Sequence, residues 1–393
     1  MRFDPYDYAI QEDPYPAYAW LRANDPVHHH EVDGFWVLSK HDDVSAAFRD
    51  DQVFSNRMGV SIDKAAWGEH AHETMSILGL DAPQHMRLRS LVAKGFTPKR
   101  VRDLEGRILE LIRTTLVPAL ERGELDWITE FAGTFPMDVV SEMMGVPEQD
   151  RDEVRRLGDL LVHREDGLRD VPEAGMNAAV ELITYYEKLI DTKRLTPAGD
   201  LTSALIEADV DGDRLEQAEI VAFLFLMVVA GNETTTKLLG NALFHGYHHS
   251  EQLARVWSGE TPVSAWIEET LRFDSSTQML ARYVVQDVDV RGTTIPAGSQ
   301  ALLLVGSANR DEDVFPDADR FDLDRDTSSL LSFGLGRHYC LGAHLARLEA
   351  RAALTFLTER IASYDLDVDR AERVHSVNVR GFKSLPIRVD VRS

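Results

Sequence analysis

The chain has almost no cysteine: Cys340 is the only one in 393 residues. A single cysteine cannot close an intramolecular disulfide, so the sequence does not fit the disulfide-stapled secreted class. The first residues also lack the charged and then apolar stretch of a secretory leader. These two absences favour a cytoplasmic protein.

The chain is also short of positive charge, with Lys+Arg 42 against Asp+Glu 66 and a net charge of -24. This charge repels phosphate backbones and anionic lipid surfaces, which argues against nucleic acid or membrane partners. Long hydrophobic runs are lacking too. The longest, Ile220 to Gly231, falls short of the ~20 residues that cross a bilayer. This run therefore predicts a helix that is buried on every side and that does not insert into a membrane.

Repeats, low-complexity linkers and sharp composition breaks are absent as well. A chain of 393 residues is long enough for two or three average domains. Without a linker to separate them, one unit over residues 1–393 is the simpler expectation. Helical patterns greatly outnumber strand-like ones, so the expected fold class is mainly α with small β-sheets in a single helix-rich unit.

The helical patterns have recognisable ends. Thr97 before Pro98 is an N-cap signal, and Asp213 with Glu216 three residues later predicts a capping box that opens the long apolar helix. Strand-like runs flank an Asp33-Gly34 turn and recur in the last third of the chain. Helices are expected over 82–96, 97–123, 128–145, 149–163, 173–194, 200–208, 213–246, 262–273 and 341–360.

The lone cysteine lies in "FGLGRHYCLG", between a glycine-rich turn and a helical pattern. Gly334 and Gly336 permit a tight turn, and Gly342 removes side-chain bulk beside Cys340. The positive end of the following helix favours a thiolate, so an axial haem ligand is one interpretation. For a lone cysteine in an arbitrary protein, a small buried hydrophobic residue is the more common explanation.

The neighbouring residues favour the first interpretation, because this segment resembles the haem-binding loop of the cytochrome P450 family. The resemblance rests on six fixed positions: Phe333, Gly334, Gly336, His338, Cys340 and Gly342. It implies that Cys340 is the iron ligand of haem b, iron protoporphyrin IX, within the P450 fold. Phe333 and Gly342 then belong to the cofactor-binding set.

Further motifs extend the resemblance along the chain. "AGNETT" resembles the oxygen-activation segment of the family, which implies Ala230 and Gly231 at the cofactor and Glu233 with Thr234 as the catalytic acid–alcohol pair. The Thr234 hydroxyl can bond the carbonyl of Ala230 one turn earlier and distort the helix there. "EETLR" supplies Glu269 and Arg272 as a structural ion pair.

The sequence departs from the common family pattern at two positions. Many family members have aspartate where Glu233 stands, and proline is common at the position of Glu312. The longer glutamate leaves the detailed proton route open. Arg320 is expected to join Glu269 and Arg272 in the structural cluster.

Cationic and imidazole side chains are expected at the haem propionates, since buried carboxylates need partners. His85 and Arg89 stand at i and i+4 on one helix face. The resemblance places these two, Arg282 and His338 at the propionates. An ordinary solvated arginine-rich helix is the alternative for the 85–89 segment.

The resemblance implies a haem-thiolate monooxygenase that inserts one atom of O2 into a C–H bond of a lipophilic small molecule. Electrons would come from a ferredoxin and its reductase. From His85 to Arg113 there are eight Lys/Arg and three Asp/Glu, which suggests a docking surface, although a solubilising helix face fits equally well. The candidates for that surface are Lys94, Lys99, Arg100, Arg102, Arg337 and Arg347. A peroxide-driven peroxygenase and a non-catalytic haem sensor are the alternative functions.

The substrate is the least determined feature. In the family, the pocket is lined from the segment before Ala82, from 160–185, from 229–234, from 276–281 and from 376–381. Apolar Val229, Met279 and Leu280 favour a steroid, terpenoid, fatty acyl chain or macrolide. Two histidine groups, at 28–30 and at 245–249, are interpreted as a strand split across two faces and a solvated helix end rather than as zinc sites.

Overall fold

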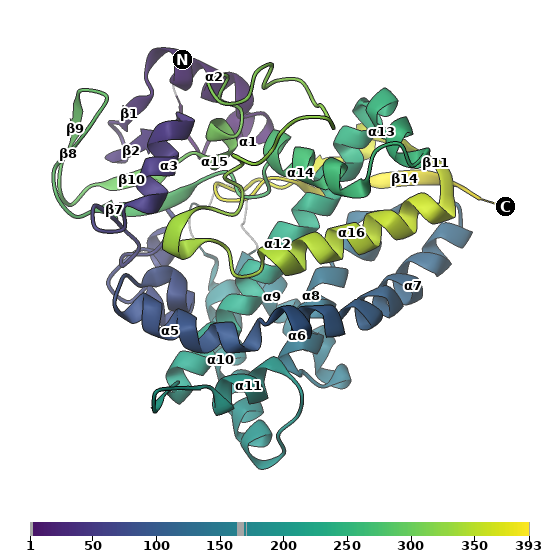
Figure 1. Cartoon of the computed structure of the whole chain (residues 1–393), viewed down its shortest axis with the longest axis horizontal. Coiled ribbons are helices and arrows are strands. Elements are labelled where there is room, and N and C mark those ends of the chain that lie inside the picture. Colours follow the sequence, from purple (N-terminus) through teal and green to yellow (C-terminus); the bar gives the residue numbers. More distant parts are fainter. Residues whose placement is uncertain (1–2, 163–168, 170, 393) are drawn as a thin grey trace.

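A long helix, α12 (Gln217–His248), crosses the middle of the molecule (Figure 1). The structure is a computed structural model, and it describes residues 3–162, 169 and 171–392. Side chains from Ile220 to Leu226 are buried, as the apolar run predicts. Ala230 is exposed, however, so the prediction of a helix buried on every side is wrong at its centre.

The start of α12 lies three residues beyond the predicted position. Glu216 is the N-cap and forms a capping box with Glu219. Asp213 lies instead in the short strand β6 (Asp213–Arg214), where its two carboxylate oxygens accept hydrogen bonds from Arg87 at 2.7 and 2.9 Å. Residues 213 and 216 both offer the capping pattern, and Arg87 binds Asp213 as well as Glu219 in the first turn of the helix.

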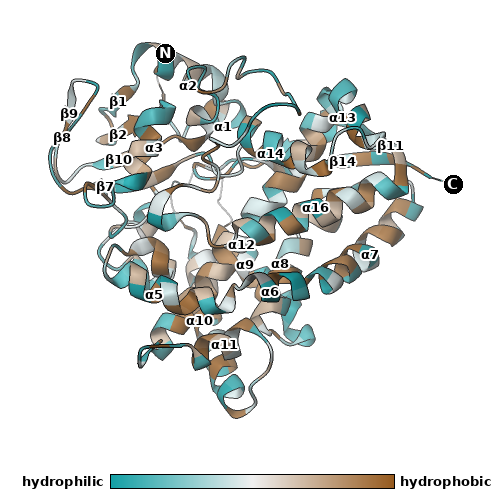
Figure 2. Cartoon of the chain, viewed as in Figure 1, coloured by the Kyte–Doolittle hydropathy of each residue, from teal (hydrophilic) through white to brown (hydrophobic). Residues whose placement is uncertain are grey.

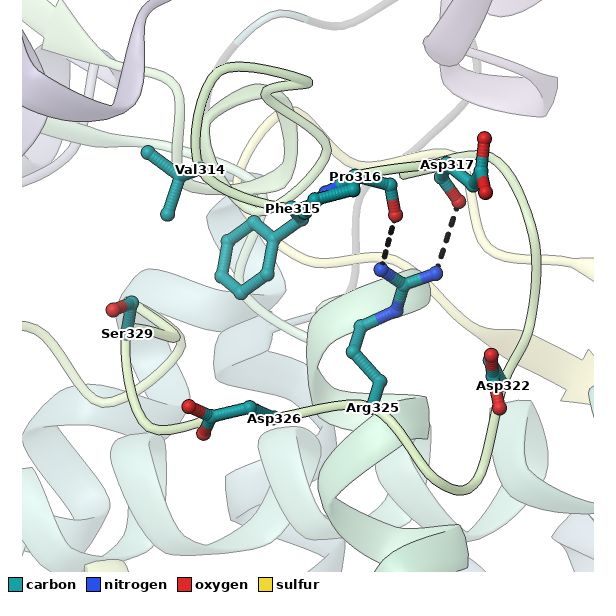
Figure 3. Close-up of a pocket in the computed structure, with 8 residues that line it drawn as sticks. All are labelled: Val314, Phe315, Pro316, Asp317, Asp322, Arg325, Asp326 and Ser329. Carbon is teal, nitrogen blue, oxygen red and sulfur yellow. Dashed lines mark hydrogen bonds between the residues drawn. The ribbon is translucent and has the colours of Figure 1, made fainter.

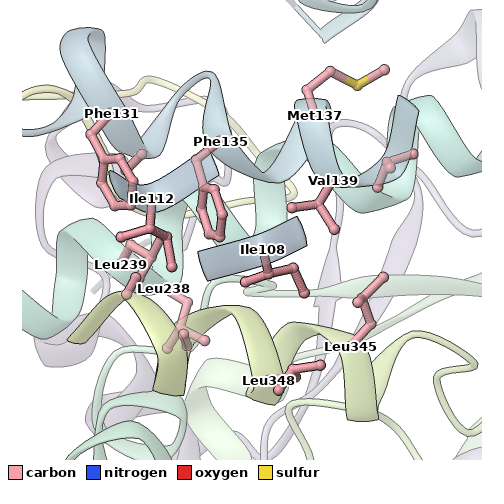
Figure 4. Packing of buried hydrophobic residues seen from close by; sticks show 14 of the residues in the cluster. Ile108, Ile112, Phe131, Phe135, Met137, Val139, Leu238, Leu239, Leu345 and Leu348 are labelled. Carbon is pink, nitrogen blue, oxygen red and sulfur yellow. The ribbon is translucent and has the colours of Figure 1, made fainter. Parts of the chain in front are cut away.

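Three further helices form the main core together with α12 (Figure 4). They are α7 (Glu105–Glu121), α8 (Phe135–Met144) and α16 (Ala343–Arg360). Ile108 and Ile112 of α7 lie between Phe135 of α8 and the Leu345 and Leu348 side of α16. This core holds α16 against the central helix. Because α16 follows Cys340 directly, the core also fixes the position of the cysteine loop.

The β-structure is concentrated near the N-terminus, at the upper left of Figure 1. A five-stranded sheet has the order β1-β2-β10-β7-β3, with β10 parallel to β2 and the other neighbours antiparallel. Its strands are β1 (Val27–His30), β2 (Phe35–Leu38), β3 (Phe54–Ser55), β7 (Leu280–Val284) and β10 (Gln300–Leu303). The predicted hairpin at Asp33-Gly34 joins β1 to β2, and Gly34 has φ 75. The sheet places Arg282, on β7, in the interior.

The other elements are short or peripheral. The smaller sheets contain β4 (Glu124–Asp126), β5 (Asp209–Val210), β8 (Val288–Val290), β9 (Thr293–Ile295), β11 (Ile361–Leu366), β12 (Glu372–Arg373), β13 (Phe382–Ser384) and β14 (Pro386–Val391). The remaining α-helices are α1 (Tyr8–Glu12), α2 (Tyr15–Asn24), α3 (His41–Arg49), α4 (His72–Met75), α5 (Gln84–Val92), α6 (Pro98–Asp103), α9 (Arg151–Val162), α10 (Glu173–Leu195), α11 (Leu201–Glu207), α13 (Ser250–Trp257), α14 (Val263–Phe273) and α15 (Val305–Ala308). The fold class, mainly α with small sheets, is as predicted.

Some predicted helices are divided. The expected helix 97–123 breaks at Leu104 into α6 and α7, although Thr97 caps α6 as predicted by accepting from the Arg100 amide. The expected helix 128–145 begins as a π-helical turn over Ile128–Ala132 before α8. The expected helix 149–163 ends at Val162, and residue 163 lies outside the described residues.

Apolar residues of the helices face one another and polar residues face outward (Figure 2). Among the helices of the described residues, α12 has the length and hydropathy of a membrane span, but 53% of that window is buried inside the protein. Since helices from both halves of the chain cover it, α12 is suited to the role of a core helix.

The buried ion pair predicted in "EETLR" is present on α14. Arg272, fully buried, donates to both carboxylate oxygens of Glu269 at 2.8 and 2.7 Å. The third member is not Arg320, whose side chain is 64% exposed and contributes only its backbone carbonyl. Arg325 takes that place, with Nε at 3.4 Å from Glu269. The sequence prediction of Arg320 is therefore wrong by one arginine along the loop.

Two segments that lie far apart in the sequence are joined beside the central helix. Thr277 forms a β-bridge with Val379, and the amide of Arg380 donates to the Ser276 carbonyl at 2.8 Å. The Arg380 guanidinium then donates to the buried Asp274 at 2.8 Å. The segments 274–280 and 376–380 are therefore held as one piece.

Candidate functional site

The loop that carries Cys340 is closed by a backbone hydrogen bond from the Cys340 amide to the Phe333 carbonyl, at 2.9 Å. Gly334 and Gly336 have positive φ values of 66 and 68, in the left-handed region that favours glycine. A Cβ on Gly336 would also lie 2.9 Å from the Phe48 carbonyl oxygen. Glycine at 336 therefore lets the loop pack directly against α3.

The thiol of Cys340 is subject to opposing electrostatic effects. Burial is the largest effect and raises the pKa of the thiol above its ordinary value, while the amides of Gly342 and Ala343 and the guanidinium of Arg89 lower it. The residue itself is accessible to solvent. The start of α16 favours the thiolate as predicted, because the Gly342 and Ala343 amides lower the pKa, but burial outweighs this effect.

Imidazole rings from two distant segments meet beside this loop. His85 comes from α5 and is 1% exposed, and its ring centroid lies 4.0 Å from that of His338 in the loop. Among the described residues, no group hydrogen-bonds any of the four ring nitrogens of this pair, although all are buried. Burial lowers the pKa of His85 to about 4 and that of His338 to about 2. Buried polar atoms without partners indicate a ligand with polar groups.

Arg282 adds a buried guanidinium on the same side. It is 3% exposed, and one nitrogen donates to its neighbour's carbonyl, that of Ala281, at 2.7 Å. No carboxylate within the described residues forms an ion pair with it, and burial lowers its pKa to about 10. A buried cation without a counter-ion is costly, so this site is suited to an anionic ligand.

Arg89 lies one turn after His85, as the i, i+4 spacing predicts, but it is engaged within the protein. Its Nη2 donates to the Tyr339 carbonyl at 2.6 Å, directly before Cys340. Arg89 thus links α5 to the cysteine loop. Together, Cys340, His338, His85 and Arg282 fit the donor set expected for haem: one sulfur, and buried nitrogen donors for two carboxylates.

On α12, the Thr234 hydroxyl donates to the Ala230 carbonyl at 3.0 Å, which is the predicted contact. The helix nevertheless continues without a break through this turn, so the predicted distortion is not observed. Gly231, which the resemblance places at the cofactor, lies in the same turn of α12. A Cβ there would instead lie 2.9 Å from Val140 of α8, so this glycine allows close helix packing.

Two buried ionisable residues near Thr234 were missed in the sequence. The Lys237 ammonium lies 3.6 Å from Glu233, at i+4, although Lys237 is only 5% exposed. Glu349 of α16 is 2% exposed and interacts with the Thr235 hydroxyl. The i, i+4 spacing of Glu233 and Lys237 was a readable signal, whereas the Glu349 contact depends on the packing of α16 against α12.

Glu349 gives a testable pH effect. Burial raises its pKa well above the ordinary value, so the folded protein keeps a proton that the unfolded chain releases above about pH 4.3. Stability from this group is therefore present at low pH and is lost as pH rises towards the folded pKa. In urea unfolding between pH 5 and 8, the free energy of unfolding of Glu349→Gln is expected not to show this decrease with pH. Glu359 is exposed on the same helix, so Glu359→Gln is expected to keep the pH dependence of the parent. Parallel curves for Glu349→Gln and the parent would contradict the assignment.

The two histidine groups are placed differently from each other. On the hairpin, His29 is exposed and His30 buried, so neighbouring rings lie on opposite faces as predicted. His245 is not at a solvated helix end. It is 9% exposed, and its Nε2 lies 2.9 Å from the buried Asp274. Burial lowers the pKa of His245 to about 4, so this ring is a structural partner of Asp274.

Some of the basic residues predicted to form a docking surface make contacts within the protein instead. Arg347 forms a two-pronged ion pair with Glu268 at 2.6 and 2.9 Å, and Arg100 donates to the carbonyls of Gly199 and Asp200. Arg337 is exposed and lies 3.3 Å from Asp51. The exposed candidates that remain are Lys94, Lys99 and Arg102.

A pocket of about 280 Å³ lies elsewhere, on the loop between α15 and the cysteine loop (Figure 3). The guanidinium of Arg325 crosses it and donates to the carbonyls of Pro316 and Asp317 at 2.5 and 2.9 Å. Its other lining residues include Asp322 and Asp326. Since neither Cys340 nor the His85 and His338 pair lines it, this pocket is not the site of the chemistry.

Comparison with known proteins agrees with the fold. A family model described as Cytochrome P450 matches residues 262–385. A protein named cytochrome P450 123, from Mycobacterium tuberculosis, is 53% identical over 390 residues, covering 99% of this chain and 97% of that protein. The vitamin D(3) 25-hydroxylase of Pseudonocardia autotrophica is 38% identical over 398 residues, covering 99% and 97%.

A solved structure gives the same result. CYP109E1 from Bacillus megaterium in complex with corticosterone superposes with a TM-score of 0.87 at 31% identity, covering 97% of this chain and 99% of that one. The chain therefore belongs to the cytochrome P450 family. It is a haem-containing monooxygenase, and as a member of the family it uses O2, a redox partner and lipophilic substrates.

Proposed function

We propose that the protein hydroxylates a C–H bond of a lipophilic small molecule, with haem b bound through Cys340. The observation that carries this proposal is the meeting of His85, His338 and Arg282 beside the cysteine loop. The ring nitrogens of both histidines have no hydrogen-bond partner among the described residues, and Arg282 is a buried cation. These residues would hold the haem carboxylates, and Arg89 would fix the loop through Tyr339. When bound, haem with a thiolate ligand supplies the oxygen and electron chemistry.

The other predicted site residues lie next to Cys340 or on α12. Phe333 and Gly342 flank Cys340, while Ala230 and Gly231 lie on α12 next to the acid–alcohol pair. The Thr234 hydroxyl, donating to the Ala230 carbonyl, holds its oxygen as an acceptor for a proton-bearing water. The half-buried Glu233 carboxylate is one residue away and would exchange protons with that water.

The substrate class is proposed from apolar side chains in the expected lining and from the relatives. Met279 is 4% exposed and packs with Phe35, Leu280 is half-buried against the five-stranded sheet, and Val229 is half-buried on α12. One relative is named for vitamin D(3), and one structural neighbour holds corticosterone. A steroid or secosteroid skeleton is therefore the first class to test. Part of the expected lining, 163–168 and 170, lies outside the described residues.

The electron donor is proposed to be an acidic ferredoxin. Three exposed basic residues lie just after α5 and on α6: Lys94, Lys99 and Arg102. Helix α5 is joined to the cysteine loop through Arg89, so these residues lie on the cysteine side of the site. Charge complementarity raises association rates and makes them depend on salt. Reduction by a ferredoxin is accordingly expected to slow as ionic strength rises.

The proposed function is tested with the purified haem-loaded protein. Corticosterone, testosterone, vitamin D3, a fatty acid and a macrolide are titrated while the haem absorbance is followed, and each compound that shifts the spin state is then offered with NAD(P)H, ferredoxin and reductase under 18O2. A product carrying one 18O atom is expected, with slower reduction at high salt. Thr234→Ala is expected to bind the same compound but to divert electrons to hydrogen peroxide.

Two outcomes would replace this function. Faster turnover with hydrogen peroxide alone than with the ferredoxin system would favour a peroxygenase. Ligand binding without any ligand-dependent NAD(P)H consumption, with every donor tested, would favour a haem sensor.

A further inference from the structure

Lys237 is a buried cation one turn after Glu233 on α12. It is 5% exposed, and its Nζ lies 3.6 Å from Glu233 Oε1. The same nitrogen donates to the Phe382 carbonyl at 3.4 Å. The ammonium is thus held between a carbonyl of the C-terminal segment and the carboxylate proposed to deliver protons.

The surroundings of Lys237 fit this side chain closely. A Cβ on Gly381 would lie 2.7 Å from both Cβ and Cδ of Lys237, so glycine at 381 allows the C-terminal segment to lie on the lysine stem. The stem is thereby confined, and the ammonium cannot turn freely towards solvent. A buried ammonium is stable only with a partner, and Glu233 is the carboxylate within ion-pair distance among the described residues.

The pairing also constrains Glu233. Its carboxylate lies 3.6 Å from an ammonium that also donates to the Phe382 carbonyl. A carboxylate bound by one oxygen loses rotamer freedom and keeps one orientation relative to Thr234, the next residue. A glutamate has one more rotatable bond than the aspartate of many relatives, so it has more need of such a constraint.

We propose that Lys237 is a positioning residue that fixes the Glu233 carboxylate for proton delivery during oxygen activation. This inference rests on the proposed role of Glu233 and Thr234. Lys237 touches neither substrate nor cofactor, and it acts only through Glu233. A purely structural lysine that joins α12 to residues 381–382 would give a different pattern of variants.

The test uses Lys237→Met, Lys237→Arg, Glu233→Gln and the double variant Glu233→Gln/Lys237→Met, all loaded with haem. With a converted substrate, hydrogen peroxide released per NAD(P)H and the solvent isotope effect are measured. Lys237→Met is expected to raise the peroxide fraction about threefold to tenfold and to change the isotope effect, because a misplaced carboxylate delivers protons poorly. Lys237→Arg is expected to restore most of the parent behaviour, since it keeps the charge.

The double variant separates positioning from structure. If Lys237 acts through Glu233, Lys237→Met adds nothing to the peroxide fraction once Glu233 is Gln. Thermal unfolding provides a readout that does not depend on turnover: both single variants are expected to lower Tm, and the double variant by less than their sum. Lys237→Gln replaces the Met variant if that one fails to take up haem.

Each other result overturns the proposal, and in a distinguishable way. If Glu233→Gln raises peroxide release but Lys237→Met does not, the proposed function stands and the role of Lys237 is wrong. If the two effects add fully, Lys237 is structural. If Glu233→Gln itself changes nothing, the assignment of Glu233 fails and the role of Lys237 fails with it.

Discussion

The Cys340→Ser variant is expected to lose the far-red-shifted Soret band of the reduced, carbon-monoxide-treated protein, together with all monooxygenase turnover. The band depends on electron donation from a thiolate, which a serine oxygen cannot supply. Cys340 is the only cysteine of the chain, so no other sulfur is available to replace it as a thiolate ligand. The absorbance spectrum of the reduced carbon-monoxide form checks this directly.

A neighbouring variant serves as the control for that loss. Tyr339 precedes the cysteine and is 38% exposed. Its carbonyl, which accepts from Arg89, is unaffected by Tyr339→Phe, so this variant is expected to keep the parent band. If Cys340→Ser showed the parent band, the ligand assignment would be wrong.

The Arg272→Leu variant is expected to be the most destabilising single change outside the site. Arg272 is completely buried and makes five hydrogen bonds: two to Glu269 and three to the carbonyls of Asn309, Ala318 and Arg320. Removing it leaves the Glu269 carboxylate buried, with Arg325 at 3.4 Å as the remaining cation. The loss in free energy of unfolding is expected to be about 3–5 kcal/mol, measured by urea unfolding.

The same measurement separates the two nearby arginines. Arg320→Ala removes an exposed side chain and is expected to change the free energy of unfolding by no more than about 0.5 kcal/mol. Arg325→Ala is expected to fall between the two, since its side chain is buried and it touches Glu269. Equal losses for Arg320→Ala and Arg325→Ala would contradict the assignment of the third member.

The sequence predicted elements well where local signals were strong. The Thr97 cap, the hairpin at Asp33-Gly34 and the apolar central helix each depend on neighbouring residues, and each is present. The start of the central helix was misplaced because two overlapping capping patterns share Glu216. Arg87, more than a hundred residues away, forms ion pairs with both Asp213 and Glu219, and this contact does not appear in the local pattern.

Contacts between distant segments account for the other errors. Arg320 and Arg325 both lie on the same loop, and only the folded path shows which guanidinium reaches Glu269. His245 was interpreted as solvated because its partner Asp274 lies on another helix end. The site residues were predicted through a family pattern. Lys237 offered only its i, i+4 spacing from Glu233, and Glu349 becomes visible only through the packing of α16 against α12.

The bridge between Thr277 and Val379 has a consequence for changing substrate preference. The ion pair between Arg380 and Asp274 holds segment 376–380 against segment 274–280. A bulkier side chain at 277–280 will therefore shift 376–380 as well. Substitutions in the two stretches will therefore be epistatic. Libraries that vary both stretches together are expected to yield altered regioselectivity at rates that separate libraries do not reach.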